Sequence, residues 1–374
     1  MPEVSAKRSE FLSFQPPAIS DAEIEAVAET LRSGWLTTGP RTAELEARMR
    51  DYLEAKHVLA VSSGTAALHL SLVALGIGPG DEVITSSLTW PATANVIVHT
   101  GATVVFADIR DDTLNIDPES VRALVNERTK AILPVDLYGQ PADLDELAAI
   151  GLPLVEDAAH AAESRYRGRK VGSISDLTCF SLYATKNIAA GEGGLISTNR
   201  DDLAEAIDDL RVMRRGHGST YDIVVPGYKA NLSDVLSSIA LVQLDKIEKH
   251  AEIRRRHVAI YEEGIAGLDG VEAVARDPRD HHANHLFVVR VTFANRDDVQ
   301  RALGEENIGT SIHFLPVHRL SAYRDRLAPH QPALPVTERA GDEVLSLPLS
   351  PAHSDDDVRD AVAALHRVHA RLAG

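Results

Sequence analysis

The sequence has little cysteine and little positive charge. Its 374 residues include one cysteine, Cys179, which cannot form a disulfide within the chain. The position of Cys179 in the apolar run "LTCFSL" predicts a small core residue. The formal net charge of -17 repels phosphate backbones at long range, which argues against nucleic acid as a partner.

Long hydrophobic runs are also missing. No stretch approaches the roughly 18 consecutive apolar residues that suggest a membrane span, and the polar start "MPEVSAKRSE" lacks the apolar segment of a secretory signal. We therefore expect a cytoplasmic protein that does not enter a membrane. A few basic side chains in a pocket could still bind a nucleotide, so the acidity does not exclude a nucleotide-linked ligand.

What the sequence does contain is an alternation of short β-rich runs and helical patterns. Several β-rich runs are apolar nearly throughout, as strands covered on both faces require. The helical patterns between them include "GTAALHLSLVALG" and "DPESVRALVNER". This order predicts an α/β protein with a mainly parallel sheet. The candidate strands are "HVLAVSS", "EVITSS", "TVVFADI", "AILPVDL", "LPLVEDA", "LTCFSLY" and "GGLISTN".

A long helical stretch from about Asp234 to Ile265 connects this region to the rest of the chain. Beyond it come β-rich "HLFVVRVTF", "IGTSIHF" and "EVLSLPL", and a final helix near Asp355 to Leu372. A chain of this length favours two domains. We expect an N-terminal arm over 1–20, a large cofactor-binding domain over 21–245, and a smaller α+β domain with the connector helix over 246–374.

Three polar positions follow predicted strands. In "AVSSGTAALHL", Gly64 and Thr65 open a helix whose N–H groups suit a phosphate, with an ordinary helix cap as the alternative. In "LPLVEDAAHA", Asp157 ends a strand, where α/β sheets place ligands, although it could also cap a following helix. In "SLYATKNIAAGEGG", Lys186 precedes a group of glycines and is either a solvated loop charge or a reactive amine.

A phosphate site, a carboxylate and an amine at one edge of a sheet suit a single molecule, pyridoxal 5′-phosphate (PLP). Lys186 would form a Schiff base with its aldehyde. Asp157 would hold the ring nitrogen protonated, so that the ring could accept electrons from a carbanion. Trp90, in "SSLTWPATAN" after another strand, could stack on the ring or pack in the core.

The order of several longer motifs is similar to that of one enzyme family. These motifs are "SSGTAAL", "DEVITSSLTWPATANVI", "GATVVFADI", "VEDAAHA", "SLYATKNIAAGEGG" and "GYKANLSDVLSSIALVQL". They resemble the DegT/DnrJ/EryC1/StrS family of PLP-dependent sugar aminotransferases, and the resemblance covers nearly the whole chain, from "GWLTTGP" to "SLPLSP". It implies the fold-type I aminotransferase architecture, with a large and a small domain, and a homodimer.

The resemblance implies a role for each matching residue. Lys186 matches the Schiff base lysine, Asp157 the partner of the ring nitrogen, and Trp90 the aromatic residue stacked on the ring. His160 matches a position that contacts the ring face or its hydroxyl. Relatives with histidine in place of the lysine catalyse a dehydration, so Lys186 favours amino transfer. The matched phosphate-binding positions are Gly64, Thr65 and Ser181, with Asn231 reaching the phosphate from the neighbouring subunit.

The implied reaction transfers an amino group, with L-glutamate as the donor, to the ketone of a nucleotide-linked sugar. "GWLTTGP", "ATKNIAAGEGG", "PGYKANLSD" and "IGTSIHFLPVHRLSAYR" are most similar to the branch that acts at sugar C4. We therefore expect a UDP- or dTDP-4-keto-6-deoxy sugar or a related one. The C3 branch is the alternative, because Tyr183 stands where many C4 enzymes have histidine. A PLP-binding regulatory protein without turnover is a further alternative, which the acidity and the lack of a DNA-binding unit disfavour.

Three residues are candidates for the substrate pocket, and two further stretches are rich in histidine or arginine. Tyr183, Lys229 and His313 are candidates for the substrate pocket, with a surface or packing role as the alternative. The run "HHANH", from His281 to His285, lacks the ligand spacing of a metal site, so we expect solvated loop histidines and no metal. "EIRRRHVAI" predicts a solvated or interface face of the connector helix.

Overall fold

Seven strands form the central sheet of the computed structural model, which describes residues 7–213 and 222–373. Two hydrogen-bonded groups, β1-β9-β8-β5 and β3-β2-β4, are joined by parallel bridges between the edges of β4 and β5. The resulting order is β3-β2-β4-β5-β8-β9-β1. The strands are β1 (His57–Val61), β2 (Glu82–Ser86), β3 (Thr103–Ala107), β4 (Thr129–Leu133), β5 (Val155–Asp157), β8 (Leu177–Ser181) and β9 (Gly194–Thr198).

The sheet is mainly parallel, as the sequence predicts. Strand β9 runs antiparallel to both β1 and β8, whereas β2 pairs in parallel with β3 and β4, and β5 with β8. All seven apolar runs proposed as strands form strands. Parallel neighbours present their carboxyl ends at one edge of the sheet, so the polar residues that follow β2, β5 and β8 can meet there.

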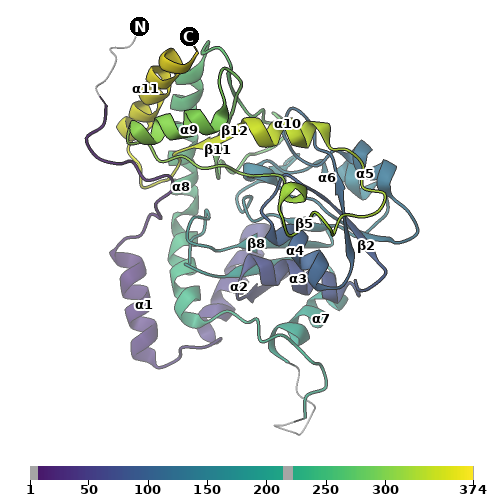
Figure 1. The fold of residues 1–374 in the computed structure, drawn as a ribbon. Coiled ribbons are helices and arrows are strands. Elements are labelled where there is room, and N and C mark those ends of the chain that lie inside the picture. The colour runs from purple at the N-terminus through teal and green to yellow at the C-terminus, as the bar shows by residue number, and fades with distance from the viewer. Residues whose placement is uncertain (1–6, 214–221, 374) are drawn as a thin grey trace.

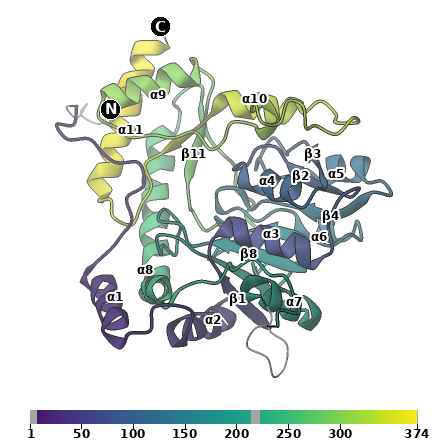
Figure 2. The ribbon, with the colours of Figure 1, turned by 60° about the horizontal axis from the view of Figure 1, so that its bottom comes forward.

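Helices cover both faces of this sheet, which explains the continuous apolar runs (Figure 2). Alternate strand residues enter different cores: Leu59 and Val61 pack with α3, α4 and α7, whereas Val58 and Ala60 pack with α2 and α8. Near β2 and β3 the second face is covered by α5 and α6. These helices are α2 (Pro40–Leu53), α3 (Gly64–Ala74), α4 (Ala92–His99), α5 (Pro118–Leu124), α6 (Leu144–Ala148), α7 (Asp201–Val212) and α8 (Asp234–Ile265).

Helix α8 connects two cores and has the bounds that the sequence predicts (Figure 1). Ser233 caps its start by accepting a hydrogen bond from the N–H of Leu236 at 3.4 Å. The first half of α8 packs on the central sheet, and the second half contributes Val258, Tyr261 and Ile265 to a separate core. The proposed boundary at residue 245 falls inside this continuous helix, and the domain limits remain predictions.

The separate core belongs to an antiparallel sheet of β10 (Val271–Ala273), β11 (Phe287–Val291) and β12 (Val344–Leu347), packed with α9 (Arg296–Glu305) and α11 (Asp355–Leu372). The N-terminal arm joins it through a bridge between Leu12 and Ile308. The expectation of a strand at "IGTSIHF" is wrong, because this segment makes two isolated bridges, Leu12 to Ile308 and Ser311 to Ser346, and no continuous ladder.

The remaining elements are short or peripheral. None of the helices within the described ranges is long and apolar enough to cross a bilayer. The remaining elements are α1 (Asp21–Ser33), α10 (Pro335–Glu343), the 3-10 turns η1 (Leu137–Gly139) and η2 (Val317–Arg319), and the hairpin of β6 (Arg165–Tyr166) and β7 (Arg169–Lys170).

Candidate active site

The proposed phosphate-binding residues meet where β8 ends and α3 begins. Ser63 caps α3 by accepting a hydrogen bond from the N–H of Ala66 at 3.0 Å, and Gly64 is the first helical residue. A Cβ atom at Gly64 would lie 3.0 Å from the Cβ of Ser181, so glycine is what lets these two segments approach. Thr65 is exposed on the first turn of the helix. Gly64, Thr65 and Ser181 therefore border the N-terminus of α3, where backbone N–H groups favour an anion.

Asp157 lies at the carboxyl end of β5 and is 6% exposed. Its Oδ2 accepts a hydrogen bond from the hydroxyl of Thr93 at 2.8 Å, and its Oδ1 accepts one from the N–H of Ala159 at 3.2 Å. Burial raises the pKa of Asp157, while these two donors and the charge of Lys186 act in the opposite direction. The alternative that Asp157 caps a following helix is wrong, because residues 158–164 form turns.

Lys186 lies in the loop between β8 and β9, close enough to Asp157 for each charge to shift the pKa of the other. The N–H of Lys186 donates to the carbonyl of Tyr183 at 2.8 Å, and Leu182 bonds Ala190 and Gly193 across the loop. Gly193 has φ 148°, a conformation that side chains disfavour, which fits the glycines after the lysine. Burial lowers the pKa of Lys186 to about 8, so the amine is partly neutral near neutral pH. A solvated loop charge is therefore the wrong description of this residue.

His160 is buried beside the same site. Its Nδ1 accepts a hydrogen bond from the N–H of Tyr138 at 3.3 Å, which leaves the proton of the neutral ring on Nε2. Burial, Lys186 and His313 hold the pKa of His160 well below its usual range. His160 is therefore a neutral ring that can contact another ring or donate a hydrogen bond from Nε2.

His285 is part of this site, although its position in "HHANH" predicts a solvated loop histidine. It is 2% exposed and its ring stacks on His160, with ring centres 4.3 Å apart. Its Nδ1 lies 3.0 Å from Oδ1 of Asn187, the residue after the lysine. The expectation of a solvated histidine is wrong, because the loop that carries His285 into β11 is paired to Tyr138 by backbone hydrogen bonds and the His285 ring packs on His160.

Asn187 extends this contact into a buried ion pair. The Nδ2 of Asn187 donates to Oε2 of Glu163 at 2.7 Å and to the carbonyl of Ala283 at 3.2 Å, which fixes its Oδ1 as the acceptor for His285. Glu163 in turn pairs with Arg254 of α8, and both side chains are buried. The expectation that the basic run of α8 is a solvated or interface face is therefore wrong for Arg254 and for the buried His257, although Arg255 and Arg256 are exposed. A charged residue enters a core when a partner neutralises it there.

The remaining predicted residues lie around the site with different exposures. Trp90 is 63% exposed, with its ring 6.1 Å from that of Phe314. Tyr183 is 48% exposed. His313 is partly buried, its Nδ1 lies 2.8 Å from the hydroxyl of Ser346, and burial and Lys186 lower its pKa to about 4.

Asn231 and Lys229 lie on the segment that leads into α8. The ammonium of Lys229 donates to Oδ1 of Asn231 at 2.5 Å, and Nδ2 of Asn231 donates to the hydroxyl of Thr38 at 2.5 Å. Asn231 also forms a backbone bridge with Val61 at the end of β1. Its predicted contact with a phosphate of a neighbouring subunit remains a prediction.

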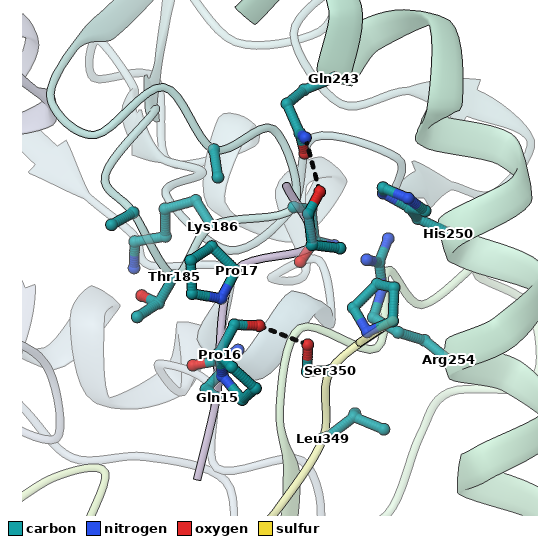
Figure 3. Close-up of a pocket in the computed structure, with 15 residues that line it drawn as sticks. Gln15, Pro16, Pro17, Thr185, Lys186, Gln243, His250, Arg254, Leu349 and Ser350 are labelled. Atoms are coloured by element: carbon teal, nitrogen blue, oxygen red, sulfur yellow. Dashed lines mark hydrogen bonds between the residues drawn. The ribbon is translucent and has the colours of Figure 1, made fainter. Parts of the chain in front are cut away.

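A small pocket lies on the side of the lysine loop that faces the N-terminal arm and α8 (Figure 3). The N-terminal arm forms one wall through Gln15 to Ala18, tied by the hydroxyl of Ser350 to the carbonyl of Pro16 at 2.6 Å. Gln243 and Arg254 of α8 form the other wall, and the side-chain nitrogen of Lys186 points away from them. This pocket therefore lies behind the lysine rather than at the carboxylate.

The residues present fit PLP. From the described residues, Asp157 accepts two hydrogen bonds, whereas a carboxylate can accept about four, so it can accept one more from a ring nitrogen. Lys186 offers a partly neutral amine, and the start of α3 offers N–H groups to a phosphate. Within the described ranges, no group of three or more histidine, cysteine, aspartate or glutamate residues is placed to hold a metal ion.

Fold and site together define a fold-type I, PLP-dependent aminotransferase. The chain belongs to the DegT/DnrJ/EryC1/StrS aminotransferase family, whose model matches residues 17–366. It is 42% identical to the spore coat polysaccharide biosynthesis protein SpsC of Bacillus subtilis, over 97% of this chain and 98% of SpsC.

Solved structures agree with this family. The PLP form of the putative sugar aminotransferase Spr1654 from Streptococcus pneumoniae has a TM-score of 0.92 and 33% identity, covering 97% of this chain and 99% of that one. PseC of Helicobacter pylori, an aminotransferase involved in pseudoaminic acid biosynthesis, has a TM-score of 0.90 and 26% identity, covering 97% and 100%. Spr1654 is also solved in a PMP form. The protein is thus a PLP-dependent sugar aminotransferase, as the motifs predicted.

Proposed function

We propose that this enzyme transfers the amino group of L-glutamate to C4 of a UDP- or dTDP-linked 4-keto-6-deoxy sugar or a related sugar. The observation that carries amino transfer is the pairing of a partly neutral Lys186 with the buried Asp157 at the sheet edge. Support for C4 comes from the motifs "GWLTTGP", "ATKNIAAGEGG", "PGYKANLSD" and "IGTSIHFLPVHRLSAYR". Transfer at C3 is the competing proposal.

Each residue of the site has a defined task in this proposal. Bound PLP supplies an electron sink for the carbon that loses or gains a proton. Lys186 holds the cofactor and, once released, carries that proton on Nζ, for which a pKa of about 8 is well suited. Asp157 keeps a proton on the ring nitrogen, His160 contacts the ring or its hydroxyl, and Trp90 stacks on the ring. Gly64, Thr65 and Ser181 bind the phosphate.

The substrate side of the proposal rests on His313, Tyr183 and Lys229. His313 lies within electrostatic reach of Lys186, because the lysine lowers its pKa. Tyr183 is exposed three residues before the lysine, and Lys229 is exposed next to Asn231. These side chains offer a ring, a hydroxyl and a charge to a sugar nucleotide.

We further propose a homodimer with shared active sites. Trp90 and Tyr183, two rings of the proposed site, are each about half exposed or more, and large apolar groups exposed together mark a surface that another molecule covers. A second copy would cover them and bring Asn231 to the phosphate. Mixing Lys186→Ala and Asn231→Ala proteins should then restore part of the activity, because a mixed dimer contains one intact site. Two inactive proteins that stay inactive when subunits demonstrably exchange would contradict shared sites.

The substrate proposal is tested in two stages. First, amino donors are added to PLP-loaded protein, and glutamate should change the cofactor absorbance, whereas Lys186→Ala should show neither the starting absorbance nor the change. Second, the converted enzyme is given 3-keto and 4-keto sugars linked to UDP or dTDP, and the aminated carbon is identified in the product. Amination of only the 3-keto sugars would overturn the C4 assignment and leave the aminotransferase activity intact.

A further inference from the structure

The hydroxyl of Thr93 donates a hydrogen bond to one oxygen of Asp157, the carboxylate at the centre of the proposed site. Thr93 lies in the first turn of α4, and its Oγ1 donates to Oδ2 of Asp157 at 2.8 Å. The hydroxyl of Thr89 lies 2.9 Å from that of Thr93. Thr89 is 1% exposed, Thr93 is not exposed, and Asp157 is 6% exposed, so water does not compete for these bonds.

The direction of this chain of hydrogen bonds follows from the number of donors. Ionised Asp157 can only accept, so the single hydroxyl hydrogen of Thr93 points at it. Thr89 must then donate its own hydrogen to Thr93. The hydroxyl of Thr93, in the first turn of α4, bonds the side chains of Asp157 and Thr89 rather than a backbone carbonyl. Its orientation serves the carboxylate rather than the helix.

We propose that Thr93 is a positioning residue for transamination, which holds Asp157 ionised and oriented toward the cofactor's ring nitrogen. This inference rests on the proposed role of Asp157. Burial favours a neutral carboxyl, and a hydrogen bond to the ionised form opposes that effect. Without the Thr93 hydroxyl, the proton shared between Asp157 and the ring nitrogen should move toward the carboxyl, which would weaken the electron sink.

The same turn also carries the residue proposed to stack on the ring. Trp90 follows Thr89 directly, and the N–H of Thr93 donates to the carbonyl of Trp90 at 3.1 Å. The short segment from Thr89 to Thr93 thus positions both the carboxylate and the proposed stacking residue, so a substitution at Thr93 would affect both proposed contacts of the ring.

Three matched variants test the inference. Thr93→Val keeps the shape of the side chain and loses the hydroxyl, and Thr93→Ser keeps the hydroxyl. Thr85→Val is the control, because Thr85 is equally buried on β2 but donates to the carbonyl of Leu133 at 2.7 Å. Each protein is loaded with PLP labelled with ¹⁵N in the ring, and the nitrogen's NMR shift reports its protonation.

We expect a pyridinium shift in the wild type, Thr93→Ser and Thr85→Val, and a shift toward neutral pyridine in Thr93→Val. The rate at which glutamate changes the cofactor absorbance should fall at least about tenfold in Thr93→Val, as loss of a hydrogen bond to a buried charge predicts. A Thr93→Val protein with an unchanged nitrogen shift would overturn the role of Thr93. If the ring nitrogen also stays protonated in Asp157→Asn, the proposed role of Asp157 is itself wrong. The two variants thus distinguish an error about Thr93 from an error about Asp157.

Discussion

The charges of Lys186 and Asp157 shift each other's pKa, and each shift is opposite to the one that burial causes. Burial lowers the pKa of Lys186 to about 8, and the charge of Asp157 raises it. Burial also raises the pKa of Asp157, and the charge of Lys186 lowers it. Each residue therefore holds the other in its charged form, and removing one charge should show in the titration of the other.

Replacing Asp157 by asparagine should lower the pKa of Lys186 below about 8, because only the effect of burial remains. The rate at which an amine reagent labels Lys186 in PLP-free protein, followed by peptide mass spectrometry against pH, measures this pKa. Asp245→Asn, on an exposed part of α8, should leave the midpoint unchanged. A midpoint that stays in place or rises in Asp157→Asn would show that the two groups do not interact.

Asn187 should contribute to both stability and cofactor binding. Asn187→Leu keeps the size of the side chain but leaves Nδ1 of His285 and one oxygen of Glu163 without their partner. We expect a loss of about 2–4 kcal/mol in the free energy of unfolding and a weaker affinity for PLP. Urea unfolding and PLP titration measure the two effects. Asn199→Leu is the control, since Asn199 is exposed and water can replace its hydrogen bonds.

Site residues that directly follow a strand could be predicted from the sequence, whereas site residues that a distant loop brings into place could not. Lys186 and Asp157 could be found because parallel strands bring their carboxyl ends to one edge. His285 lies about a hundred positions from Lys186, and only the tertiary path of its loop places it against His160. Arg254 was missed for the same reason, because its charge is neutralised by Glu163 on another segment.

At the scale of elements, the start of α2 depends on a residue of α8. Gly39 at the start of α2 has no capping side chain of its own. Asp234, 1% exposed in the first turn of α8, accepts hydrogen bonds from the N–H groups of Gly39 at 2.8 Å, Arg41 at 3.0 Å and Thr42 at 3.0 Å. One carboxylate thus satisfies the N-terminus of a helix far away in the sequence.

Asp234→Ala should therefore cost about 2–4 kcal/mol of unfolding free energy, because the buried N–H of Thr42 and the partly buried N–H groups of Gly39 and Arg41 lose their acceptor. Thermal or urea unfolding measures this change. Asp245→Ala tests the same substitution in the same helix at an exposed ion pair with Arg48, and it should cost less than about 1 kcal/mol. Equal costs for the two variants would contradict the capping role of Asp234.

Strands of the central sheet could be predicted because both of their faces are buried, which leaves a continuous apolar run. The segment "IGTSIHF" mixes apolar and polar residues and forms no strand, because its backbone makes only two isolated bridges, Leu12 to Ile308 and Ser311 to Ser346. An apolar run thus indicates burial, and the neighbouring strand decides whether a ladder forms.

At the scale of the whole molecule, a pair of buried carboxyl groups lies beneath the site. Asp136 and Glu156 are both fully buried and interact directly. Asp136 Oδ1 accepts from the N–H of Ala142 at 2.9 Å, and Glu156 Oε2 accepts from the hydroxyl of Thr178 at 2.8 Å. The hydroxyl of Ser175 acts on Glu156 and lowers its pKa, but within the described ranges neither Asp136 Oδ2 nor Glu156 Oε1 has another donor at hydrogen-bonding distance. A single proton between them would satisfy both.

The folded protein should therefore bind this proton more tightly than the unfolded chain does. Burial and the neighbouring Glu156 hold the pKa of Asp136 well above its ordinary value of 3.8. The stability that this proton contributes is complete below pH 3.8 and is lost as the pH rises through the raised pKa of the folded state. In Asp136→Asn, an amide N–H that does not titrate takes the place of this proton. The variant should therefore keep this stability as the pH rises.

Unfolding free energies of the wild type and Asp136→Asn, measured by urea from acid to alkaline pH, should consequently diverge as the pH increases. In the interval between the two pKa values, the wild type should lose about 1.4 kcal/mol per pH unit relative to the variant. Asp51→Asn, at an exposed carboxylate, provides the control and should follow the wild type. Parallel curves for the wild type and Asp136→Asn would mean that the pair is not protonated in the folded protein, and its two unpaired oxygens would then need another donor.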